Sequence, residues 1–262
     1  MKTSQLKISD EMLREIIRSY TRESGVRILE RELANLCRKA ACGIADGRFK
    51  SLTVRDSNLE KLLGAKKYKP DSPDRNDSVG LVRGLAYTSV GGETLDVEVS
   101  VLRGSGKLEL TGNLGDVMKE SAKAAVSYIR SRCELLQIDP GFYMNQDLHV
   151  HFPEAAVPKD GPSAGITICI ALISALTNRP VRSDVAMTGE ITLRGRILAI
   201  GGLREKTMAA LRAGIKTVII PKDNETDLNE IDQEVRRQLT FITADHVDQI
   251  LNVVFTDPLS VQ

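Results

Sequence analysis

The chain has 262 residues, and 36 Lys and Arg against 35 Asp and Glu give it a formal net charge of +1. This near-neutral charge gives no reason to expect nucleic acid or a membrane surface as the main partner. Its four cysteines are scattered without a CxxC pair, and no apolar run is long enough to be a signal or membrane-spanning segment. A zinc site, a disulfide framework and a membrane anchor are therefore not expected, and we predict a cytoplasmic protein.

The first part of the chain is predicted to be helical. Apolar residues recur at helical spacing over 12–20 and again over 26–40. A last helix is expected to begin after Ser57 as its N-cap and to end at Gly64. We therefore predict a small all-α domain over residues 1–66.

The segment 67–78 contains two prolines and charges of both signs, which is typical of an exposed linker. After it the pattern changes to alternating strands and helices, which predicts a mixed α/β domain over residues 79–262. The first two strands are expected to be joined by a turn at Gly91-Gly92. The helices are predicted at 116–136, 163–176, 203–214 and 245–254. The first two strands are predicted at 80–90 and 94–102 and the remaining strands at 107–112, 147–152, 184–189, 216–221 and 238–243, with a hairpin at 191–200.

The stretch VPKDGPSAG, at 157–165, contains the G-x-S-x-G pattern of a nucleophile elbow around Ser163. An elbow serine directly follows a strand, whereas three prolines separate Ser163 from the predicted strand before it. Ser163 could instead be the N-cap of the apolar helix that follows it. The two interpretations are compatible, because a helix N-terminus offers amide donors to a developing oxyanion.

A nucleophilic serine needs a base. His246 is the only histidine after Ser163, so an esterase-like hydrolase would use it. A lysine base needs its pKa lowered by roughly 3 units from about 10.4. Lys206 is a candidate because it lies in the first turns of a predicted helix with apolar neighbours, and both desolvation and a helix N-terminus disfavour the ammonium ion. Spacing alone does not select one lysine from the many in the chain.

Three segments, PKDGPSAG at 158–165, MTGEITLRGRILAIGGLREK at 187–206 and GIKTVIIP at 214–221, together resemble the proteolytic domain of Lon. Lon is a family of ATP-dependent serine proteases with a Ser–Lys dyad. The segment at 106–125 extends this resemblance, and YTRESGVRILERELANLCRKA, at 20–40, resembles the small helical lid of the Lon AAA+ module. The resemblance implies a lid domain followed by a protease domain.

The resemblance also implies roles for five residues. Ser163 matches the nucleophile, Lys206 the general base and Thr188 the hydroxyl that orients the lysine amine. Asp160 matches an acidic residue that switches the loop ahead of the nucleophile between active and inactive shapes. Arg27 matches the sensor-2 arginine that the lid presents to bound nucleotide. The chain departs from the family at Ala155, where glycine is usual, and a positive φ at this position would strain the loop just before the site.

Two other patterns have weaker functional interpretations. His149 and His151 face the same way on a predicted strand, but no third metal ligand has suitable spacing, so a structural pair is favoured over a metal site. The stretch RGSGK, at 103–107, resembles part of a phosphate loop but lacks the full pattern, and a hairpin turn is the better interpretation.

No Walker A or B motif is present, so we expect the chain to be the C-terminal part of a longer enzyme. It would need no cofactor itself, whereas the full-length enzyme would use ATP and Mg²⁺. The resemblance implies a serine endopeptidase that degrades unfolded or damaged polypeptides and assembles as a hexameric ring. DNA binding is left as an alternative only for the full-length protein. A non-catalytic oligomerisation scaffold and the esterase-like hydrolase remain as alternatives.

Overall fold

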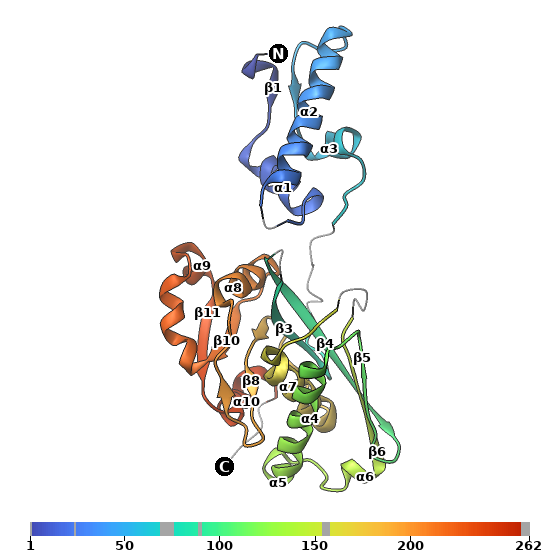
Figure 1. Ribbon diagram of the computed structural model, residues 1–262, viewed down its shortest axis with the longest axis vertical. Helices are drawn as coiled ribbons and strands as arrows, with labels where there is room; N and C mark the ends of the chain where they lie inside the picture. Colours follow the sequence, from blue (N-terminus) through green and yellow to red (C-terminus); the bar gives the residue numbers. More distant parts are fainter. Residues whose placement is uncertain (1, 24, 69–75, 89–90, 154–157, 258–262) are drawn as a thin grey trace. The chain divides into compact units, whose positions relative to one another are not determined.

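The computed structural model describes residues 2–23, 25–68, 76–88, 91–153 and 158–257 (Figure 1). The chain divides into two compact units, Met1–Asp71 with Ser89–Gly91, and Ser72–Thr88 with Gly92–Gln262. Each unit has its own hydrophobic core. The domain limits 1–66, 67–78 and 79–262 stay a prediction.

The first unit is built around three helices, α1 (Asp10–Tyr20), α2 (Arg27–Ala45) and α3 (Asp56–Leu63). A single 3-10 turn, η1 (Thr3–Gln5), precedes strand β1 (Leu6–Lys7), which pairs in parallel with β2 (Leu52–Thr53). The helices bury a small core whose members are Ile16, Tyr20, Leu36, Val54 and Leu59. The helical periodicity of the sequence thus predicted α1 and α2, whereas it did not predict the pairing of β1 with β2.

The predicted start of α3 is wrong. Arg55, not Ser57, is the N-cap, because the Asn58 side chain accepts the Arg55 backbone N–H at 2.9 Å. The side chain of the third helical residue therefore satisfies the exposed amide. Gly64 ends the helix with a φ of 90°, as expected for glycine at this position.

The second unit contains a seven-stranded mixed sheet. Its strands lie in the order β11 (Thr240–Ala244), β10 (Thr217–Pro221), β7 (Val185–Met187), β3 (Leu81–Thr88), β4 (Gly91–Arg103), β6 (Gln146–His151) and β5 (Leu108–Thr111). Strands β11, β10, β7 and β3 run in parallel, and β4 pairs antiparallel with β6. A separate hairpin joins β8 (Glu190–Ile191) to β9 (Ile197–Leu198). The predicted Gly91-Gly92 turn is wrong, because both glycines belong to β4.

The helices of this unit are α4 (Asp116–Ser131), α5 (Cys133–Leu136), α6 (Phe142–Asn145), α7 (Gly165–Thr177), α8 (Leu203–Arg212), α9 (Gln233–Gln238) and α10 (Leu251–Val254), with 3-10 segments η2 (Pro162–Ala164), η3 (Lys222–Glu230) and η4 (Val247–Gln249). The helix predicted over 116–136 is divided, because Arg132 leaves the helical region with a φ of −125°. The closing helix predicted over 245–254 is likewise two short segments, η4 and α10.

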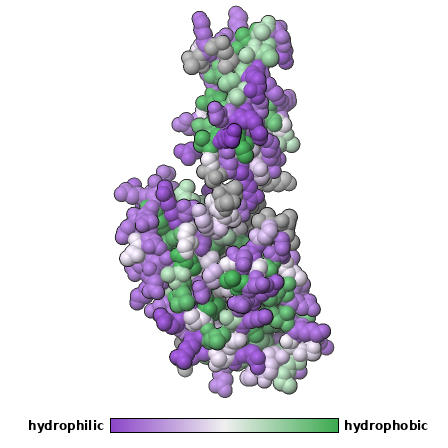
Figure 2. All heavy atoms as spheres, in the orientation of Figure 1, coloured by the Kyte–Doolittle hydropathy of each residue, from purple (hydrophilic) through white to green (hydrophobic). Residues whose placement is uncertain are grey.

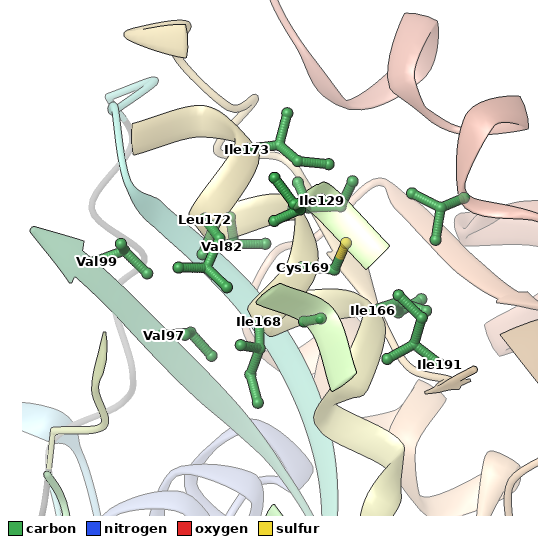
Figure 3. Close-up of a cluster of buried hydrophobic side chains, with 14 of the residues drawn as sticks. Val82, Val97, Val99, Ile129, Ile166, Ile168, Cys169, Leu172, Ile173 and Ile191 are labelled. Atoms are coloured by element: carbon green, nitrogen blue, oxygen red, sulfur yellow. The ribbon is translucent and has the colours of Figure 1, made fainter. Parts of the chain in front are cut away.

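Helices cover both faces of the sheet. Helices α4, α7 and α10 pack on one face, and α8 and α9 pack on the other, over β3, β7 and β10 (Figure 1). Helix α7 is the centre of the larger core, since every residue from Gly165 to Ser174 is buried. Figure 3 shows its aliphatic side chains meeting those of β3, β4 and α4, in a cluster that includes Ile168, Leu172, Val82, Val97 and Ile129. The core is mostly aliphatic.

Hydrophobic and hydrophilic residues are interspersed on the face of the molecule seen in Figure 2. Over the part of the chain that the structure describes, no helix combines the length and the apolar character needed to cross a bilayer.

Candidate functional site

Ser163 lies in η2, the short turn that leads into α7. Gly161, with a φ of 139°, and Pro162 precede it. Ala164, rather than Ser163, occupies the N-cap position of α7, so the prediction that Ser163 caps this helix is wrong. Ser163 is half-buried, and the turn places it just before α7 rather than in the first turn of that helix.

The carboxyl end of β7 holds the backbone of Ser163. The Ser163 carbonyl accepts the Gly189 N–H at 2.8 Å and the Thr188 hydroxyl at 3.4 Å. In return, Ile166 N–H donates to the Gly189 carbonyl at 3.1 Å. Thr188 is fully buried, and its own N–H donates to the carbonyl of Ile219 on β10 at 3.1 Å. The sheet therefore fixes the position of the serine.

Lys206 lies on α8, on the face of the sheet opposite to α7. Its side chain is only 2% exposed, and burial lowers the pKa of its amine to about 8. A buried amine favours the neutral form, because little water is available to solvate the ammonium ion. Of the apolar residues near it on the same helix, Leu203 and Ala210 are also buried, whereas Met208 is 45% exposed.

One hydroxyl connects the lysine to the serine. Lys206 Nζ donates to Thr188 Oγ1 at 3.0 Å, and Thr188 Oγ1 donates to the Ser163 carbonyl. In the described part of the chain, no hydrogen bond joins Lys206 Nζ directly to Ser163 Oγ. Because the amine is the donor to Thr188, the lone pair of its neutral form stays available to accept a proton. The structure thus brings Ser163, Thr188 and Lys206 together.

Asp160 is exposed and lies at the N-terminus of α4. Its carboxylate accepts the N–H groups of Met118 at 3.2 Å and Gly161 at 3.0 Å. The N-cap of α4 is Gly115, which has no side chain, so Asp160 supplies the capping oxygen from another segment. The Gly115 N–H also donates to the Lys159 carbonyl at 2.7 Å. The loop ahead of Ser163 is thereby attached to α4.

Arg27 belongs to the first unit and is the first residue of α2. It is exposed, and none of the other four predicted site residues lies in this unit. The Glu23 carboxylate accepts the backbone N–H groups of Ile28 and Leu29, at 2.7 to 2.9 Å, and so caps the helix that begins with Arg27. Ala155 lies outside the described residues.

Both ring nitrogens of His246 lie close to other partners. Its Nε2 is 2.8 Å from the Arg194 carbonyl oxygen, and its Nδ1 accepts the Asp248 N–H at 3.2 Å. Within the described residues, no hydrogen bond joins His246 to Ser163. The geometry therefore gives no support to an esterase-like site with His246 as base.

The two other patterns have structural explanations. His149 Nε2 and His151 Nδ1 lie 2.8 and 2.7 Å from the same Thr111 hydroxyl. Among the residues with described positions, no group of three or more His, Cys, Asp or Glu side chains could hold a metal ion. In the RGSGK loop, the Ser105 and Lys107 N–H groups donate to the Asp147 carboxylate, both at 2.8 Å, and these bonds hold the pKa of Asp147 below its usual range. The backbone amides of this loop that could bind a phosphate already donate to the Asp147 carboxylate.

Sequence reasoning missed several glycines that shape this site. A Cβ on Gly92 would lie 1.9 Å from the Glu205 carbonyl oxygen, so the bare backbone of β4 packs directly against the turn of α8 that carries Lys206. A Cβ on Gly165 would lie 2.8 Å from the Ile191 N, and one on Gly189 would lie 2.7 Å from an Ile197 methyl group. These are contacts between segments distant in sequence, and only the glycines themselves could have indicated them.

Comparison with known proteins assigns both units. Residues 53–257 match the Lon protease (S16) C-terminal proteolytic domain, and residues 1–52 match the Lon protease AAA+ ATPase lid domain. The chain is 57% identical to the Lon protease of Bacillus thuringiensis and 56% identical to Lon protease 1 of Bacillus subtilis, each over 251 residues. It is 54% identical to the Lon protease of Clostridioides difficile over 252 residues.

A lid of the AAA+ type followed by a serine protease domain is therefore the class of protein that this chain represents. The chain belongs to the Lon protease family. The alignments cover 96% of the chain but only 32% of each of these three relatives.

Proposed function

We propose that this chain is the proteolytic part of an ATP-dependent serine endopeptidase, with Ser163 as nucleophile and Lys206 as general base. The observation that carries the proposal is the buried Lys206 amine, whose pKa is about 8 and whose Nζ lies 3.0 Å from Thr188 Oγ1. A base works best when its pKa lies near the working pH, and this amine meets that condition.

In the first step, Ser163 Oγ attacks the carbonyl carbon of a peptide bond while the neutral Lys206 amine accepts the hydroxyl proton. The ammonium ion then gives that proton to the leaving amine, and the peptide C–N bond breaks to leave an acyl-enzyme. In the second step Lys206 takes a proton from water, which attacks the ester carbonyl. The ester C–O bond then breaks, the Lys206 ammonium ion returns the proton to Ser163 Oγ, and the acid is released. Thr188 holds the amine in place during both steps through its hydroxyl.

Asp160 and Arg27 have supporting roles in this proposal. Asp160 controls the shape of the loop before Ser163, and its bond to the Met118 N–H at the start of α4 supports that role. Arg27 senses nucleotide from the exposed start of α2. The whole enzyme binds ATP and Mg²⁺ outside this chain, acts on unfolded or damaged polypeptides in the cytoplasm and forms a hexameric ring.

Labelling with a fluorescent fluorophosphonate, which reacts with activated serines, tests the proposal. We expect the wild-type chain to be labelled at Ser163, and the Ser163→Ala and Lys206→Ala variants to lose at least about 90% of the label, because general-base catalysis contributes roughly 10²–10⁴-fold. Folding of each variant is checked by circular dichroism. Equal labelling of wild type and Lys206→Ala would overturn the role of the lysine, and a well-folded wild type that takes no label would favour the scaffold.

A further inference from the structure

Asn224 on η3 holds the backbone of Ile200 with both ends of its side-chain amide. Its Oδ1 accepts the Ile200 N–H and its Nδ2 donates to the Ile200 carbonyl, both at 2.9 Å. Nδ2 also donates to Asp227 Oδ2 at 2.6 Å. Asn224 is only 3% exposed, so these bonds are shielded from water. The amide pairs with Ile200 as a neighbouring strand would.

Ile200 lies just ahead of Leu203, the first residue of α8. Gly201 and Gly202 follow it, and Gly202 takes a left-handed conformation with a φ of 70°. Lys206 N–H donates to the Gly202 carbonyl at 3.1 Å, the first hydrogen bond of the helix. Because the Gly202 carbonyl accepts the Lys206 N–H and Gly202 lies two residues after Ile200, we expect a shift of Ile200 to move the first turn of α8 and the lysine on it.

The lysine tolerates little displacement. Among the described residues, its amine has one hydrogen-bond partner, Thr188 Oγ1, and burial is the cause of its lowered pKa. No charged group compensates for a loss of burial. If α8 rotates or frays at its start, water reaches the amine and its pKa rises toward the ordinary value of about 10.4.

We propose that Asn224 is a positioning residue for the reaction: its grip on Ile200 fixes the start of α8 and so keeps the Lys206 amine buried against Thr188. This inference rests on the proposed role of Lys206 as the general base. Asn224 does not touch the nucleophile, and η3 is a segment to which neither the sequence motifs nor the proposed mechanism gives a role.

The consequence is a change in pH dependence with no change in substrate affinity. In Asn224→Ala we expect the pKa of Lys206 to rise by roughly one pH unit, because the amine becomes partly hydrated. At pH 7 the neutral fraction would then fall roughly tenfold, and kcat with it. Above pH 9 to 10, roughly, wild type and variant should converge, and KM should stay the same.

Two control variants distinguish a specific effect on the position of Lys206 from a general loss of stability of the fold. Ser174 is another fully buried side chain that clamps backbone, since it accepts the Gly80 N–H at 2.9 Å and donates to the Arg179 carbonyl at 2.5 Å. It lies near the end of α7, away from α8, so Ser174→Ala should lower the melting temperature without changing Lys206. Asp227→Asn removes the charge of the carboxylate that accepts the Asn224 Nδ2 but leaves both bonds between Asn224 and Ile200. It should therefore also leave the pKa of Lys206 unchanged.

The test is an NMR titration of the chain with ¹³Cε-labelled lysine, with the Lys206 signal assigned by its loss in Lys206→Met. A higher Lys206 pKa in Asn224→Ala, with wild-type values in Ser174→Ala and Asp227→Asn, supports the proposal. An unchanged pKa in a folded Asn224→Ala overturns it, even if activity falls. If Asn224→Ala does not fold, the titration is repeated with Asn224→Asp, which preserves the volume of the side chain but cannot donate to the Ile200 carbonyl. A higher Lys206 pKa in this variant supports the proposal, and an unchanged pKa overturns it. A wild-type Lys206 that titrates near 10.4 would instead refute the proposed general base.

Discussion

A single buried amine links the stability of the fold to its chemistry. Lys206 is 2% exposed and its pKa is lowered to about 8 from an ordinary 10.5. In the folded state it therefore holds its proton less tightly than in the unfolded state. Between these two pKa values the unfolded chain binds more protons, so the free energy of unfolding must rise with pH in that window. Below pH 8 both states are protonated, and the full destabilisation is present.

Lys206→Met should remove this effect. Methionine has a similar length and no charge. We therefore expect it to raise the free energy of unfolding at pH 7 by on the order of 3 kcal/mol, which is the free-energy equivalent of the difference between the ordinary and the lowered pKa of Lys206. We also expect the rise in stability between about pH 8 and pH 10 to disappear. Urea unfolding of both proteins across pH 6 to 10, followed by circular dichroism, measures both quantities. A wild-type stability that is level across this range would mean that the lysine is not desolvated.

At the scale of elements, the segment before Ser163 and helix α4 depend on each other. The Asp160 carboxylate accepts the Met118 N–H, and the loop backbone pairs with the chain on either side of Leu114. A Cβ on Gly115 would lie 2.3 Å from Asp160 Cγ, so only glycine leaves room for the carboxylate. A change in the loop therefore alters the helix cap, and a change in the helix cap alters the loop.

Asp160→Ala and Asp160→Asn should differ in stability. Alanine offers no acceptor for the Met118 N–H, and loss of a helix N-cap costs about 1 kcal/mol. Asparagine keeps an acceptor oxygen and should retain most of the stability. Urea denaturation at pH 7 compares them. Equal stability of the alanine and asparagine variants would show that the bond to α4 contributes nothing.

The elements that the sequence could predict are those with a local pattern. Helical periodicity located α1 and α2, and alternation with aliphatic runs located most strands of the large sheet. Errors arose where tertiary contacts decide the outcome. Gly92 looked like a turn residue because its packing against Glu205 is invisible in a single sequence. Arg132 divides a helix whose apolar pattern continues past it.

The candidate site was only partly predictable for the same reason. Ser163 stands out by its motif, whereas Lys206 could be chosen from the other lysines only through the resemblance to Lon. Its burial depends on residues far away in sequence. Asn224 gave no signal at all, because an asparagine that bonds to backbone 24 positions away has no local pattern.

At the scale of the whole molecule, each unit has a core of its own. The core of the first unit is one hydrophobic cluster of residues between 16 and 59. The second unit has two hydrophobic clusters, formed by residues between 82 and 255. All three residues of the proposed catalytic group lie in the second unit. The lid supplies none of them. The chemistry should therefore belong to the second unit.

The decisive measurement is cleavage of a fluorogenic peptide, without nucleotide, by the wild-type chain, Lys206→Ala and His246→Ala across pH 6 to 10. The Ser–Lys mechanism predicts a wild-type rate that rises with pH, is half-maximal near pH 8, where half of Lys206 is neutral, and levels off roughly one pH unit higher. It further predicts that Lys206→Ala is inactive and that His246→Ala keeps its activity. An active Lys206→Ala together with an inactive His246→Ala would contradict the mechanism.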